Sequence, residues 1–134
     1  MYIDWLPEYQ VEVAEIDDQH KKFVLLINDV YDTIEVGCEE IILGDILDQL
    51  DAYSEYHFAT EEKYFDLFKY PDSIKHKQVH QDFRNQVASF REHYQENEDL
   101  YARRVLEFMK NWLTDHIVTL DKAYAECFHE HGLK

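Results

Sequence analysis

Seven residues of types that bind metal ions recur at helical spacings in this 134-residue chain. Imidazole nitrogens and carboxylate oxygens are metal donors, and steps of three or four residues place side chains on one face of a helix. Each such group buried alone would be destabilising, so a converging set requires compensating cations. The predicted metal ligands are His20, His57, Glu61, His76, His80, His116 and Asp121.

The number and type of these donors indicate the metal. Structural zinc uses four ligands and usually thiolates, whereas calcium and magnesium prefer oxygen to imidazole. Mixed nitrogen and oxygen donors suit iron, with manganese or zinc as substitutes, and seven side chains exceed one octahedron. Two octahedral irons offer twelve positions, of which five imidazoles, two bridging carboxylates and one solvent-derived oxo or hydroxo bridge occupy eleven. One position remains for a small exogenous ligand.

Each residue taken singly also has an ordinary interpretation. A lone His20 is typical of a surface or capping histidine, and His57 with Glu61 is typical of an exposed polar pair. Their joint occurrence on the apolar stripe of every predicted helix favours metal binding. Three further histidines lie off this pattern and are interpreted as solvated or terminal: His93, His129 and His131.

Long helices are expected to carry these residues, because the chain has only three Gly and two Pro with 46% hydrophobic residues. The first helix is expected to begin at Asp17 or Asp18 and to end at Gly37. Breaks before and after the third helix are indicated by Pro71 and by the polar residues 95–99. The second helix would then cover about 40–68.

The fold class predicted from these elements is all-α. We expect one domain over residues 1–134, with an extended arm over 1–16 and an antiparallel up-down-up-down four-helix bundle over 17–131. The net charge of −16 argues against nucleic acid as a partner. No apolar run is long enough to cross a bilayer, and the first residues do not form a secretory signal. Since Cys38 and Cys127 share no CxxC spacing, a reducing cytoplasm is the expected location.

The order and spacing of the seven residues resemble those of the hemerythrin family. The matching segments are His20, HFATE at 57–61, HKQVH at 76–80 and HIVTLD at 116–121, and the resemblance covers nearly the whole chain. Among members of the family, the sequence is most similar to the single-domain prokaryotic bacteriohemerythrins.

This resemblance implies a non-haem centre of two iron ions with an oxo or hydroxo bridge, which binds dioxygen reversibly. It implies that His76, His80 and His116 hold the coordinatively full iron. It further implies that His20 and His57 hold the iron with the open position. The two bridging residues would be Glu61 and Asp121.

Bulky apolar residues are expected to exclude water from the ligand position. The predicted oxygen pocket consists of Phe23, Phe58, Trp112, Leu113 and Ile117. Neutral imidazoles predominate over carboxylates, which favours reversible binding over oxidation of substrates. No candidate nucleophile or general base accompanies the site, so an enzyme is not expected.

Three alternatives to a simple oxygen carrier stay open at this point. The protein could store, deliver or sense dioxygen, it could be a di-iron oxidase or a peroxide- or nitric oxide-handling enzyme, or it could store or detoxify iron. Two tyrosines, Tyr53 and Tyr124, are candidates for a hydrogen bond to the bound ligand.

The spacing of the last ligand pair predicts a local distortion. Asp121 follows His116 by five positions, which places them about 140° apart on a regular α-helix. Both side chains can face the metals only if the helix is widened. We therefore predict a π-bulge between them.

Overall fold

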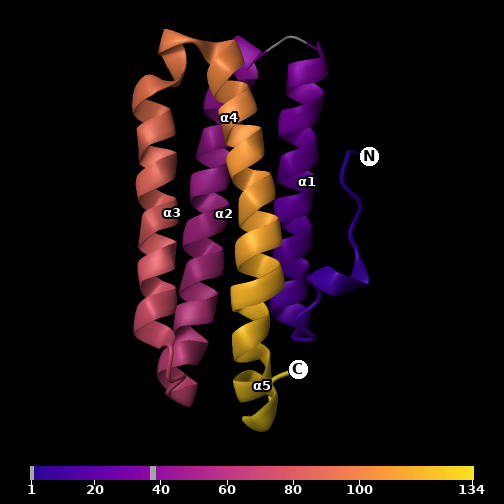
Figure 1. Cartoon of the computed structure of the whole chain (residues 1–134), viewed down its shortest axis with the longest axis vertical. Helices are drawn as coiled ribbons and strands as arrows, with labels where there is room; N and C mark the ends of the chain where they lie inside the picture. The colour runs from indigo at the N-terminus through magenta and orange to yellow at the C-terminus, as the bar shows by residue number, and fades with distance from the viewer. Residues whose placement is uncertain (1, 37–38) are drawn as a thin grey trace.

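Four long helices form an antiparallel bundle, as the sequence predicts (Figure 1). The computed structural model describes residues 2–36 and 39–134, so the expected helix end at Gly37 lies outside the described residues, as does Cys38. The fourth helix of the bundle is continuous, and it consists of three consecutive parts at residues 98–111, 112–121 and 122–130. The elements are η1 (Pro7–Tyr9), α1 (Ala14–Val36), α2 (Glu39–Phe68), α3 (Ser73–His93), η2 (Tyr94–Glu96), α4 (Glu98–Asn111), η3 (Trp112–Asp121) and α5 (Lys122–Glu130).

The first helix begins earlier than the sequence predicts. It starts at Ala14, so the arm covers 2–13, and the expected arm over 1–16 with a helix start at Asp17 or Asp18 is wrong. The Asp17 carboxylate does accept backbone hydrogen bonds, from the N–H groups of Val11 at 2.8 Å and Glu12 at 3.1 Å. Because these donors lie in the arm, Asp17 attaches the arm to α1 and does not act as the N-cap of the helix.

The arm lies beside α1 and is extended except for the short turn η1 (Figure 1). Asn28 pairs with the backbone of Ile3 in both directions, accepting from its N–H at 2.8 Å and donating to its carbonyl at 2.9 Å. Val11 and Val13 are buried against the bundle. The arm therefore covers the end of the core next to the start of α1.

The two predicted breaks occur where the sequence places them. After Pro71, α3 begins at Ser73 with Asp72 at its N-cap. The Asp72 carbonyl accepts a hydrogen bond from the N–H of His76 at 3.0 Å, which starts the helical bonding. In the second break, Asn97 caps α4 by accepting from the N–H of Leu100 at 3.1 Å.

The predicted distortion of the last helix is confirmed. Residues Trp112–Asp121 form a π-helix, η3, between two α-helical parts. In a π-helix the hydrogen bonds join residues five apart, so His116 and Asp121 share a face. The widened segment is longer than a single bulge, and it turns both side chains into the bundle, where they are buried.

The bundle interior contains two apolar clusters with a polar layer between them. The larger cluster includes Phe23, Phe58, Phe83 and Ile117. The smaller cluster lies at the other end of the bundle and comprises Val11, Val13, Ile16, Phe65, Tyr70, Tyr124 and Phe128. Along the chain, His20 falls between Ile16 of the smaller cluster and Phe23 of the larger one, and His76 and His80 fall between Tyr70 and Phe83 in the same way. None of the described helices is long and apolar enough to cross a membrane.

Candidate metal centre

All seven predicted ligands converge in the polar layer, and none has a side chain more than 4% exposed. They form two groups, in each of which one donor atom per residue lies within 4.8 Å of the others. The three-histidine group consists of Glu61, His76, His80 and His116. The two-histidine group consists of His20, His57, Glu61 and Asp121. Glu61 belongs to both groups, so the two candidate metal positions are adjacent.

Asp121 also faces both groups, with a different oxygen toward each. Its Oδ1 lies 2.9 Å from Nε2 of His116 and 3.0 Å from Nε2 of His76. Its Oδ2 lies 3.0 Å from Nε2 of His20. Glu61 Oε1 lies 3.3 Å from Nε2 of His57 and 3.0 Å from Nε2 of His80. Each carboxylate is therefore placed to bridge two cations.

Most of these close approaches lack hydrogen-bond geometry. Among the described residues, Nε2 of His20, His57 and His80 and both carboxylate oxygens of Asp121 are buried without a hydrogen-bond partner. Nε2 of His76 and Nε2 of His116 instead pair with each other in a hydrogen bond of 3.2 Å. Buried donor atoms that lie close together and mostly lack hydrogen-bond partners point toward shared positions, and nitrogen with carboxylate oxygen is a donor set for iron, manganese or zinc. The residues thus fit a pair of transition-metal ions.

Two residues outside the predicted set orient the imidazoles. His57 Nδ1 donates to Gln19 Oε1 at 2.5 Å, and His80 Nδ1 donates to Glu62 Oε2 at 2.9 Å. A proton on Nδ1 leaves the lone pair of Nε2 free to bind a metal. The sequence analysis missed both partners. The available signal was that Gln19 precedes His20 and Glu62 follows Glu61.

Aromatic rings cover the histidines of the three-histidine group. The ring of Trp112 stacks on His116 with centroids 3.8 Å apart, and Phe58 stacks on His80 at 3.9 Å. Of the predicted oxygen-pocket residues, Phe23, Phe58, Leu113 and Ile117 are at most 1% exposed, whereas Trp112 is half-buried. The centre is therefore enclosed by large side chains, which restrict rotation of the imidazoles.

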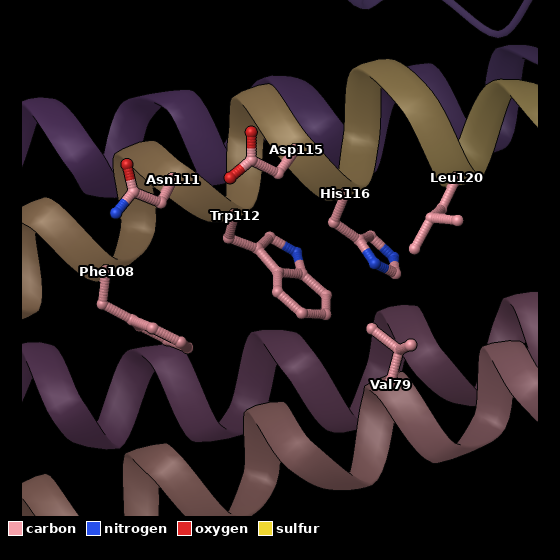
Figure 2. A pocket seen from close by; sticks show the side chains of 7 residues that line it. All are labelled: Val79, Phe108, Asn111, Trp112, Asp115, His116 and Leu120. Atoms are coloured by element: carbon pink, nitrogen blue, oxygen red, sulfur yellow. The ribbon is translucent and has the colours of Figure 1, made fainter.

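A groove with about 270 Å³ of space runs along the outer side of this group. Trp112 and His116 of η3 point across it toward Val79 of α3 (Figure 2). The groove is predominantly apolar, and His116 at its inner side is only 3% exposed. It lies beside the three-histidine group.

The two tyrosines that the sequence singles out lie at the centre and differ in their bonding. The hydroxyl of Tyr124 donates a short hydrogen bond to Glu61 Oε2. The hydroxyl of Tyr53 is buried and has no partner among the described residues. Burial and the charges of Glu61 and Asp121 raise the pKa of both phenols well above the usual value, so both retain their protons.

Burial and ion pairing set the charges of the metal-free centre. Burial lowers the pKa of His57 to about 4, so its imidazole is neutral. Burial alone would raise the pKa of Asp121, but His116, His20 and His76 outweigh it and hold that pKa well below the usual range. The carboxylate is therefore ionised and able to bind a cation.

Fold and site together define a metal-binding four-helix-bundle protein, and comparisons with known proteins identify its family. The model of the hemerythrin HHE cation binding domain matches residues 11–127. The chain therefore belongs to the hemerythrin family, which confirms the resemblance seen in the sequence.

Individual relatives extend this result over nearly the full chain. A bacteriohemerythrin of Stenotrophomonas maltophilia is 28% identical over 95% of this chain and 82% of its own length. A bacteriohemerythrin of Methylococcus capsulatus is 31% identical over 90% of this chain and 91% of its own. A crystal structure of wild-type hemerythrin superposes with a TM-score of 0.81 at 30% identity, covering 95% of this chain and 98% of that one.

Proposed function

We propose that this protein binds dioxygen reversibly at a centre of two iron ions joined by an oxo or hydroxo bridge. The observation that carries the proposal is the pair of buried donor groups that share Glu61 and face Asp121 from both sides. The names of the similar proteins, bacteriohemerythrin among them, support the same function.

Each residue has a defined role in this proposal. His76, His80 and His116 would hold one iron, whereas His20 and His57 would hold the iron with the open position, as the family resemblance implies. The carboxylates of Glu61 and Asp121, each of which faces both groups, would supply donors to both ions. A bound iron pair would supply the reversible electron transfer to dioxygen that binding and release require.

The side chains around the candidate metal positions favour release of dioxygen over its further reaction. Five imidazoles and only two carboxylates would surround the metals, so the donor set is less anionic than in carboxylate-rich di-iron bundles. The buried aromatic rings of Phe23 and Phe58 exclude water and larger molecules from the centre. Gln19 and Glu62 hold the imidazoles in the orientation that presents Nε2 to the metals.

Metal analysis combined with repeated oxygenation cycles tests this function. We expect two irons per chain and an optical change that follows dioxygen stoichiometrically and reverses on deoxygenation. Steady consumption of dioxygen in the presence of a reductant would instead indicate an oxidase. Uptake of iron well beyond two per chain would indicate iron storage.

A further inference from the structure

One polar atom at the centre has no role in holding the metals. Tyr53 lies on α2, one turn before His57, and its buried hydroxyl has no hydrogen-bond partner among the described residues. Folded proteins rarely leave a buried hydroxyl unbonded. Tyr124, the other phenol at the centre, already donates to Glu61. Tyr53 therefore has a donor available for a group that is not part of the chain.

The position of this phenol relates it to the two-histidine group. Its ring lies parallel to that of His57, with centroids 5.5 Å apart and planes inclined by 13°. The ring of Phe23 also lies beside Tyr53, with centroids 5.6 Å apart and planes inclined by 28°. In the three-histidine group the corresponding ring on His80 is Phe58, which has no hydroxyl. The phenol thus accompanies the group for which the donor count leaves one metal position open.

We propose that the Tyr53 hydroxyl donates a hydrogen bond to the small ligand held at the two-histidine position and thereby slows its release. The proposal rests on the function proposed above. The ligand class is a di- or triatomic molecule with a terminal lone pair, such as dioxygen or azide. Since the neighbouring Phe23 is apolar and buried, the hydrogen bond forms in a medium of low dielectric constant, where it is strengthened.

Removal of the Tyr53 hydroxyl group tests this role, with azide as the probe ligand. Tyr53→Phe keeps the ring and removes the donor, and Tyr56→Phe on the same helix, where the side chain is 61% exposed, is the matched control. In optical titrations of the iron-loaded ferric protein, we expect Tyr53→Phe to weaken azide binding about tenfold, the effect of one hydrogen bond. The infrared stretching frequency of bound azide should shift in Tyr53→Phe and stay constant in Tyr56→Phe.

The stability of the metal-free protein provides a readout that does not depend on the metals. Removing an unpartnered hydroxyl should leave the free energy of unfolding unchanged or raise it. A loss of stability in Tyr53→Phe with unchanged azide binding would show a structural role and overturn the proposal. Unchanged azide affinity and frequency alone would also overturn it, while leaving reversible oxygen binding intact. If the iron-loaded wild-type protein binds neither azide nor dioxygen, both proposals fail.

Discussion

The two halves of the centre are built from the same side-chain types but differ in their surroundings. In the three-histidine group, imidazoles from α3 and η3 are covered by the rings of Phe58 and Trp112, and His80 is held by the charged Glu62. In the two-histidine group, imidazoles come from α1 and α2, and His57 is held by the neutral Gln19.

Under the proposed function, this difference would make the two adjacent candidate metal positions unequal. The three-histidine group supplies more nitrogen donors and a charged hydrogen-bond acceptor, both of which favour firm retention of a metal. The two-histidine group supplies fewer nitrogens and has the free phenol of Tyr53 beside it. We therefore expect substitutions to affect metal retention on one side and ligand exchange on the other.

The largest effect is expected at the residue that faces both groups. Asp121→Asn removes a buried charge that lies within about 3 Å of three imidazoles, and it replaces one of the two oxygens with an amide nitrogen that cannot bind a metal, so the residue can no longer bridge the two positions. Iron content should fall from two per chain to less than one, measured by metal analysis, while circular dichroism still shows a helical protein. Asp115→Asn, an exposed position in the same π-helix, is the control and should retain both irons. Retention of two irons by Asp121→Asn would contradict a bridging role.

The next effect concerns the residues that hold the imidazoles. Glu62→Leu removes a charged acceptor from His80, and Gln19→Leu removes a neutral one from His57. Loss of such partners weakens metal binding by about 10- to 100-fold, and we expect the larger loss for Glu62→Leu. Competition with a chelator measures the change. Glu55 is an exposed partner of Arg84, and the control variant Glu55→Leu should bind iron as the wild-type protein does. Equal losses in Glu62→Leu and Gln19→Leu would remove the proposed asymmetry.

A smaller effect is expected from the pH dependence of the metal-free protein. His57 has a pKa of about 4 when folded and about 6.5 when unfolded, so acid favours protonation of the unfolded chain. Its contribution to stability is complete above pH 6.5 and falls as the pH drops toward 4, by about 2 kcal/mol between pH 7.5 and pH 5.

Urea unfolding at the two pH values measures this change. His76 acts in the opposite direction: although burial lowers its pKa, the Asp121 carboxylate 3.0 Å from its Nε2 outweighs that effect and raises the pKa. The contribution of His57 is therefore the difference between the wild-type protein and His57→Gln. If both lose the same stability on acidification, His57 is not the group that responds.

The smallest effect separates the two phenols. Tyr124→Phe leaves Glu61 Oε2 without its buried donor and should lower the free energy of unfolding of the metal-free protein by about 1.5 kcal/mol. Chemical denaturation measures this change. Tyr53→Phe, which removes an unpartnered hydroxyl, is the reference and should cost nothing. A cost for Tyr53→Phe equal to that of Tyr124→Phe would mean that the two phenols are equivalent.

Much of the fold and of the candidate centre could be predicted from local spacing alone. A helix turns by a constant angle per residue, so the intervals within 57–61 and 76–80 place each pair on one face. The interval of five between His116 and Asp121 is incompatible with a regular helix, which is why the sequence also predicts η3. The break at Pro71 follows from the missing N–H of proline.

Contacts between helices could not be predicted in this way, because they depend on how each helix is rotated and shifted against its neighbours. The sequence therefore predicted the seven side chains that converge, whereas only the tertiary structure joined Gln19 to His57 and Glu62 to His80. The tertiary structure also decided that the Tyr124 hydroxyl is bonded and that the Tyr53 hydroxyl has no partner among the described residues, and that Asp17 binds the arm in place of capping α1. Periodicity determines which residues face inward, and packing determines what they meet there.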